Sequence, residues 1–176
     1  MGGKVAQLIA GRESPFGLKG VVLIAPAPPT PLVLPEEMRK QQIEAYESPE
    51  AAEFVVRNVL TAKVLGDEVV KGLVEDMMRG NECAKRAWPD YGMGEDILED
   101  VEGVRLPVLV IAGELDKVET VERVRREVLG NLKGEKHMVV IEKVGHLLPL
   151  EAPERIAGLI EGFVGKVMEA QAERLA

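Results

Sequence analysis

The sequence predicts an α/β fold in which parallel strands are covered by helices. Two β-branched runs without polar alternation, residues 20–26 and 108–113, are typical of strands buried on both faces of a parallel sheet. Helical patterns separate these runs, and strands that alternate with helices are typical of parallel sheets. The chain has 176 residues, which suits one domain with a core of its own.

The first half of the chain places one strand between two helical regions. An apolar stripe formed by Val5, Leu8 and Ile9 predicts a helix over residues 2–12, ahead of the strand at residues 20–26. Prolines then end that strand. Helical patterns dominate as far as residue 101, with Ser48 as a predicted N-cap. The helices predicted in this region span residues 35–46, 49–62, 67–79 and 82–87.

The second half returns to alternating elements. A helix over residues 119–132 follows the strand at 108–113, and a third strand at 137–142 precedes a final helix over residues 153–172. We therefore expect residues 1–34 and 102–176 to form a partial α/β core. Residues 35–101 are expected to form a helical cap or lid inserted between two strands.

Composition narrows the class of protein. The net charge of -8 and the pI near 5.0 argue against nucleic acid or an anionic membrane as a partner. The single cysteine, Cys83, excludes an internal disulfide and a cysteine-rich metal site, and we expect neither a metal nor a cofactor. No run approaches the roughly 20 apolar residues of a membrane span. We therefore expect a cytoplasmic protein without a membrane span.

Two loops that follow predicted strands carry residues suited to catalysis. Asp116 comes just after the strand at residues 108–113, and His146 comes just after the strand at residues 137–142, behind Gly145. In parallel sheets the catalytic groups gather at the carboxyl ends of the strands, so these two side chains can meet. A carboxylate that accepts the imidazole N–H fixes its tautomer and stabilises its charged form. The pair therefore predicts the acid and the base of a nucleophilic triad.

Three motifs together resemble the α/β-hydrolase family. They are GELD at residues 113–116, VGH at 144–146 and LEAPE at 150–154, in the family's order of acid before histidine. The resemblance covers nearly the whole chain. It implies the C-terminal part of an α/β-hydrolase fold, a helical cap, Asp116 and His146 as catalytic residues, and an esterase-like hydrolase acting on a carboxylic ester or a similar small acyl substrate.

The start of the chain resembles the segment that follows the nucleophile in this family. The elbow reads G-x-S-x-G there, commonly as G-H-S-M-G-G before a helix, and the chain begins with MGG. The resemblance implies that the nucleophile stands immediately before Met1, and that Met1 occupies the position of an oxyanion-hole donor. Neither Ser14 nor Ser48 lies in an elbow-like sequence, and Cys83 falls in the predicted cap.

Several alternatives stay open at the level of sequence. The chain alone is expected to lack triad activity, and the missing nucleophile is a serine or an aspartate. The sequence is then a shortened form of an esterase, a non-catalytic module that binds a ligand or partner, or one half that complements a separate N-terminal half. A strand edge left open at residues 21–25 would favour a homodimer or such a complementing chain.

Overall fold

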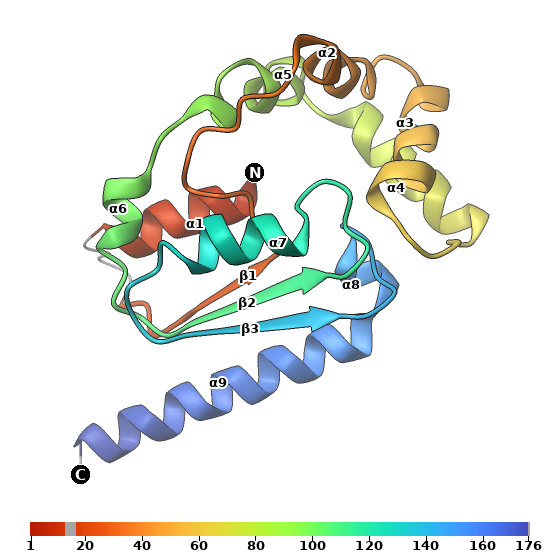
Figure 1. The fold of residues 1–176 in the computed structure, drawn as a ribbon. Helices are drawn as coiled ribbons and strands as arrows, with labels where there is room; N and C mark the ends of the chain where they lie inside the picture. Colours follow the sequence, from red (N-terminus) through yellow and green to blue (C-terminus); the bar gives the residue numbers. More distant parts are fainter. Residues whose placement is uncertain (13–16, 176) are drawn as a thin grey trace.

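Three parallel strands form the centre of the structure, a computed structural model that describes residues 1–12 and 17–175, with side chains through residue 173. The strands are β1 (Val21–Ile24), β2 (Val108–Gly113) and β3 (Lys136–Ile141). They lie in the order β1-β2-β3, and β2 pairs in parallel with both neighbours. All three predicted strands are confirmed, as is the α/β class (Figure 1).

The burial of the strands follows their places in the sheet. All six residues of β2 are buried, and residues 108–112 alternate between two apolar clusters on opposite faces of the sheet. β1 is covered on both faces as predicted, because Val21 and Leu23 pack in one apolar cluster and Val22 and Ile24 pack against the other. Only Leu23 is fully buried, since β1 has β2 on one side and, among the described residues, no strand on the other.

Helices cover both faces of the sheet (Figure 1). The long helix α9 (Pro153–Leu175) runs along one face. The other face carries α1 (Gly2–Gly11) and the predicted helix over residues 119–132, which forms as α7 (Val121–Arg123) followed by a π-helical segment, η3 (Val124–Leu129). None of the described helices has both the length and the apolar character to cross a membrane.

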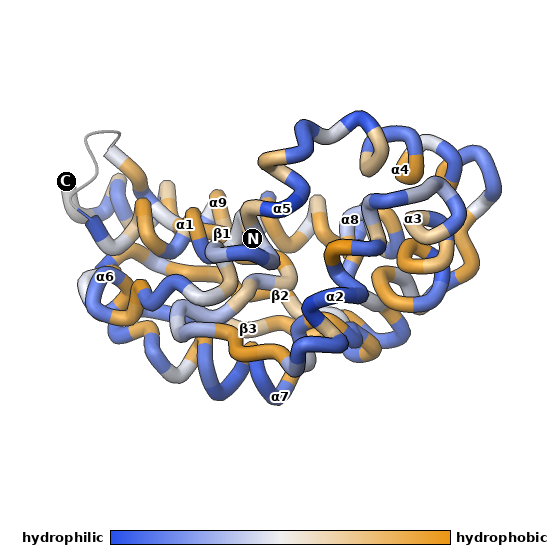
Figure 2. The backbone as a smooth tube through the Cα atoms, turned by 90° about the horizontal axis from the view of Figure 1, so that it is seen from above, coloured by the Kyte–Doolittle hydropathy of each residue, from blue (hydrophilic) through white to orange (hydrophobic). Residues whose placement is uncertain are grey.

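Four further helices arch over the sheet on the side of α1 and α7 (Figure 1). In Figure 2 the strands are mainly apolar, whereas much of α2 and α7 is hydrophilic. Ser48 caps α3 as predicted, since its Oγ accepts a hydrogen bond from the Ala51 N–H at 3.2 Å. The arch consists of α2 (Glu36–Glu44), α3 (Pro49–Val55) with the π-helical η1 (Val56–Leu60), α4 (Asp67–Arg79) and α5 (Glu82–Asp90).

Three short helices were not predicted, because segments of three to five residues carry too little periodicity to detect. They are η2 (Gly92–Gly94), α6 (Leu98–Glu102) and α8 (Leu148–Glu151). α6 contacts α1, and its Val101 is buried in the cluster that also contains Leu23. The division of the chain near residues 34 and 102 stays a prediction.

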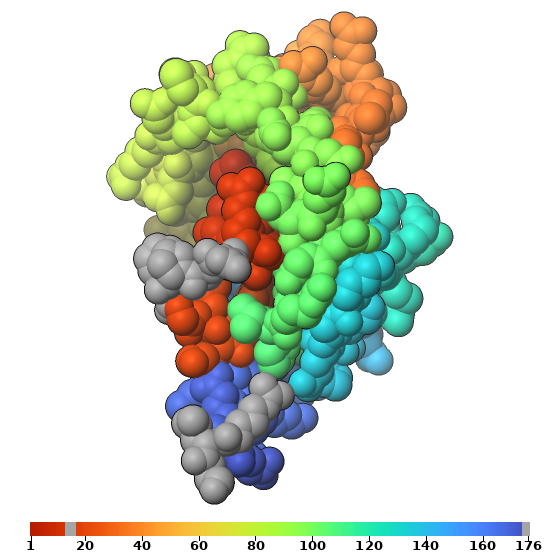
Figure 3. Space-filling view, turned by 90° about the vertical axis from the view of Figure 1, so that its left-hand side faces the viewer, coloured from red at the N-terminus to blue at the C-terminus, as the bar shows by residue number. Residues whose placement is uncertain are grey.

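One buried charged side chain, that of Lys4, holds both stems of the arch, which are the segments that lead into it near residue 30 and out of it near residue 95. Its ammonium, on α1, donates to the carbonyl oxygen of Thr30 in the first stem and to that of Glu95 in the second. Burial lowers the pKa of Lys4, and nearby Asp96 and Glu95 oppose that change. Figure 3 shows α1 at the surface between the arch and α9.

Candidate active site

Asp116 lies at the carboxyl end of β2, with its side chain fully shielded from solvent. Its Oδ1 accepts hydrogen bonds from the backbone N–H groups of Val118 at 2.7 Å and Glu119 at 2.9 Å. A carboxylate that folds back onto the following amides in this way closes its own turn. The two bonds fix the carboxylate and leave Oδ2 free for another partner.

That partner is His146, in the loop after β3. Its Nδ1 lies 2.8 Å from Asp116 Oδ2, so the predicted contact between the two side chains is confirmed. With Nδ1–H donating to the carboxylate, a neutral imidazole carries its lone pair on Nε2. Nε2 makes no hydrogen bond to any residue that the structure describes, and the side chain is 24% exposed. The pair therefore presents an oriented imidazole whose Nε2 atom has no hydrogen-bond partner among the described residues.

Two glycines allow the strand ends to come this close. A Cβ on Gly113 would lie 2.2 Å from the carbonyl oxygen of Gly145 and 2.5 Å from that of Val144. A Cβ on Gly145 would lie 2.8 Å from the Ala62 nitrogen. These separations are shorter than van der Waals contact, so only glycine fits between the acid loop, the histidine loop and the arch.

The histidine loop is held from the side of the arch. The backbone N–H groups of His146 and Leu147 both donate to the Leu60 carbonyl oxygen, at 2.9 and 3.0 Å. The buried carboxylate of Glu151 accepts from Gly145 N–H at 3.0 Å through Oε1, and from the N–H groups of Ala62 and Lys63 at 2.9 Å through Oε2. Glu151 therefore ties the residue before His146 to the end of η1.

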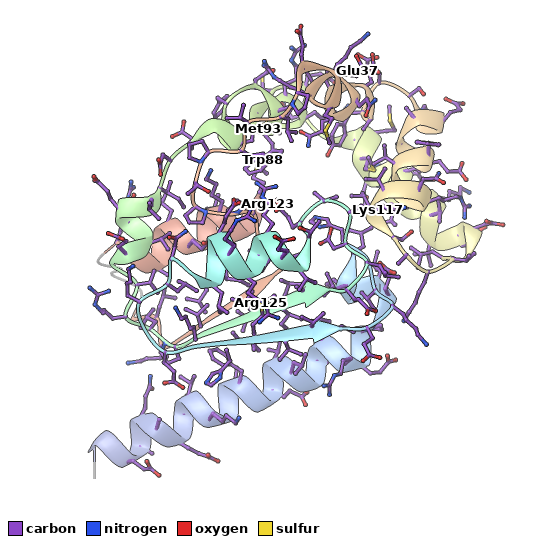
Figure 4. All side chains as sticks on the ribbon, in the orientation of Figure 1. Glu37, Trp88, Met93, Lys117, Arg123 and Arg125 are labelled. Carbon is purple, nitrogen blue, oxygen red and sulfur yellow. The ribbon has the colours of Figure 1, made fainter. Side chains whose placement is uncertain are left out.

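A cavity of about 370 Å³ lies between the arch and the core, beside the acid loop. Its walls are mainly apolar, and four residues supply charged groups: Glu44, Lys117, Glu119 and Arg123. Trp88 from α5 and Arg123 from α7 point toward this space from opposite sides (Figure 4). An apolar space with a few charged groups, next to the loop that carries the catalytic acid, is the arrangement expected of a small-molecule site.

Glu119 is the most strongly perturbed acid near the pair. Burial raises its pKa to about 7, while Arg123 and His146 act in the opposite direction. No group of three or more His, Cys, Asp or Glu side chains is arranged to hold a metal ion within residues 1–12 and 17–175.

The comparisons with known proteins are consistent with this geometry. The model of the alpha/beta hydrolase family matches residues 1–159. The chain belongs to the alpha/beta hydrolase family. A comparison with curated proteins found no match.

Solved structures of hydrolases share the fold. An esterase from Exiguobacterium antarcticum superposes with a TM-score of 0.79 at 15% identity, covering 93% of this chain and 63% of that one. A thermophilic esterase from Thermogutta terrifontis superposes with a TM-score of 0.66 at 24% identity, covering 94% of this chain and 62% of that one. A protein from Acinetobacter baumannii that is described as a lipase superposes with a TM-score of 0.73 at 20% identity, covering 96% of this chain and 59% of that one. The chain thus spans about 60% of the length of these structures.

The hydrolase motif predicts a role for Met1, and the structure locates this residue near the acid loop. Met1 precedes α1, and its carbonyl oxygen accepts from the Lys4 N–H at 2.9 Å. Burial lowers the pKa of the Met1 amine and the charge of Glu119 raises it, so the two groups lie within electrostatic reach. Its part in an oxyanion hole stays a prediction.

The sequence predicts that the other serines and the cysteine are not nucleophiles. The Ser48 hydroxyl is engaged as the N-cap of α3, and Cys83 is exposed on α5. Ser14 lies outside the described residues. Sequence reasoning missed the roles of Glu119 and Glu151, although the LEAPE motif contains Glu151.

Proposed function

We propose that this chain supplies the acid and the base of a serine-type esterase that cleaves small carboxylic esters. The hydrogen bond of 2.8 Å between His146 Nδ1 and Asp116 Oδ2 carries the proposal, because it orients the imidazole and, in the neutral tautomer with the proton on Nδ1, leaves the Nε2 lone pair free to accept a proton. The family membership and the mainly apolar cavity beside the acid loop support it.

In the proposed reaction, His146 Nε2 takes the proton of a serine hydroxyl as its oxygen attacks the ester carbonyl. The protonated imidazole then gives this proton to the departing alkoxide, which leaves as the alcohol and produces an acyl-enzyme. A water molecule attacks the acyl group by the same route, and the acid and the free serine are restored. Asp116 stabilises the charged imidazole throughout, with two backbone N–H groups stabilising its carboxylate in turn.

The serine itself belongs, in this proposal, to the position before Met1 in a longer polypeptide, and the Met1 N–H to the oxyanion hole. The location of Met1 within electrostatic reach of Glu119 supports this, because Glu119 follows the acid loop. The open edge of β1 would then pair with a strand of the same missing part, or of a separately encoded one.

The decisive experiment begins with the codons upstream of Met1. In-frame codons for G-x-S should be present, and the longer product should hydrolyse p-nitrophenyl butyrate. His146→Ala should then lower kcat by about 10⁴- to 10⁶-fold. His137→Ala is the matched control, because this second histidine is exposed on β3, and it should change kcat by less than about twofold. A longer product that is inactive, or equal losses in both variants, would refute the proposal.

A non-catalytic ligand-binding module is the second candidate, and the cavity favours it because this chain forms the cavity without further residues. A stop codon directly upstream, together with saturable binding of small apolar molecules and no ester turnover, would establish this alternative.

A further inference from the structure

Two side chains that line the cavity, Gln42 and Glu119, each have a buried oxygen that accepts no hydrogen bond within the described residues, and Glu119 is the more deeply buried of the two. Glu119 is 3% exposed, yet its Oε2 accepts no hydrogen bond from any described residue. Arg123 Nη1 lies 3.3 Å from this oxygen, but the contact lacks hydrogen-bond geometry. A buried acceptor without a donor costs free energy, and a ligand that supplies the donor removes that cost.

The surroundings of Glu119 limit what such a ligand can be. Apolar side chains such as Leu34, Phe54 and Trp88 form much of the wall, so the body of the ligand must be apolar. Arg123 does not favour an anionic ligand, because it already lies within 3.4 Å of both Glu119 and Glu127. An added carboxylate would share the cavity with two acidic side chains of its lining, Glu44 and Glu119, whereas an added donor would meet an acceptor with free lone pairs.

We propose that Glu119 determines the specificity of the cavity by accepting a hydrogen bond from a hydroxyl or amino group on a small, otherwise apolar ligand. For an ester substrate, which rests on the function proposed above, that donor is a substituent on the part of the molecule that lies in the cavity. Oxygen lone pairs are present in both protonation states of Glu119, so the preference does not require a charged carboxylate.

Two isomeric probes test the preference by binding alone, without any ester cleavage. 3-Phenylpropan-1-ol carries a hydroxyl donor, and 2-phenylethyl methyl ether has the same atoms and no donor. Both are titrated into the ¹⁵N-labelled chain while the amide signals of Val118 and Glu119 are followed. The alcohol should bind about 10-fold more tightly, the ratio expected for one hydrogen bond to a buried, partly charged acceptor.

Variants assign the preference to one side chain. Glu119→Met removes the acceptor at similar volume, and the ratio of the two dissociation constants should fall to about one while the ether binds as before. Glu119→Gln retains an acceptor oxygen and should keep a preference for the alcohol. Glu122→Gln, an exposed acid one turn along, is the matched control and should leave the ratio unchanged.

Equal affinity of the wild-type chain for both isomers, a preference that persists in Glu119→Met, or no saturable shift with either isomer would overturn the inference. The wild-type comparison decides even if a variant does not fold. Because the readout is binding, its failure is separable from that of the esterase proposal. If a longer chain hydrolyses no ester, a measured preference for the alcohol still supports the inference. If a longer chain is an active esterase but the two isomers bind equally, the inference still fails.

Discussion

Replacing Glu151 with alanine should destabilise the protein strongly although the residue is polar. Its carboxylate accepts three backbone hydrogen bonds, from Gly145, Ala62 and Lys63. Alanine leaves three N–H groups without an acceptor in a partly buried setting, and at about 1 kcal/mol for each group the loss is about 3 kcal/mol. A domain of this size has about 5–15 kcal/mol in total, so the loss is a large share of its stability.

Urea unfolding followed by circular dichroism measures this loss, with Glu154→Ala as the control. Glu154 is exposed in the first turn of α9 and should contribute only about 0.5 kcal/mol through the helix dipole. Hydrogen exchange gives a second readout, because the amides of Gly145 and Ala62 should exchange faster in Glu151→Ala than in the control. Equal free energies of unfolding for the two variants would show that the three hydrogen bonds do not hold the loop.

Three further predictions concern stability and association. Burial raises the pKa of Glu119 to about 7, so ionisation opposes folding as pH rises from 4.5 to 7. Glu119→Gln should therefore gain up to about 3 kcal/mol over wild type between pH 4.5 and 7.5 in urea unfolding, and an unchanged difference would contradict this. Gly113→Ala should cost about 1–3 kcal/mol by the same assay, while Gly72→Ala, with open space around it, should not destabilise. The chain should self-associate through β1, where the Val22 N–H points to the open edge because Val21 and Ala25 donate inward. Light scattering should show less association for Val22→Pro, and a wild-type monomer at every concentration would refute the edge contact.

The sequence predicted the Asp116–His146 pair because each residue stands directly after a strand that its own neighbours reveal. Asp116 and His146 each follow a β-branched run, so strand prediction alone was enough to bring them together. Glu151 could not be understood in this way, because two of its partners, Ala62 and Lys63, lie nearly 90 positions earlier and offer only backbone N–H groups. A backbone donor is present at almost every position, so residue types carry no trace of such a contact.

Burial was the other property that residue patterns did not reveal. Glu119 begins a charged helical stretch and looks like a solvated residue, yet the arch above it makes it one of the least exposed acids. The strand at residues 20–26 is covered on both faces as its apolar run predicted, but that run did not reveal the partial exposure that results from having β2 as its one neighbour among the described strands. Both depend on which segments meet in space, and neither periodicity nor propensity contains that information.

The bonds from His146 and Leu147 to the Leu60 carbonyl also bear on how a molecule would enter the cavity. If the η1 end of the arch swung outward, it would drag the imidazole away from Asp116. We therefore expect residues 60–63 to keep their position when a ligand binds. Any widening of the cavity is then expected at the far rim, where α2 and α5 lie (Figure 1), with the imidazole kept aligned on Asp116 while a ligand enters.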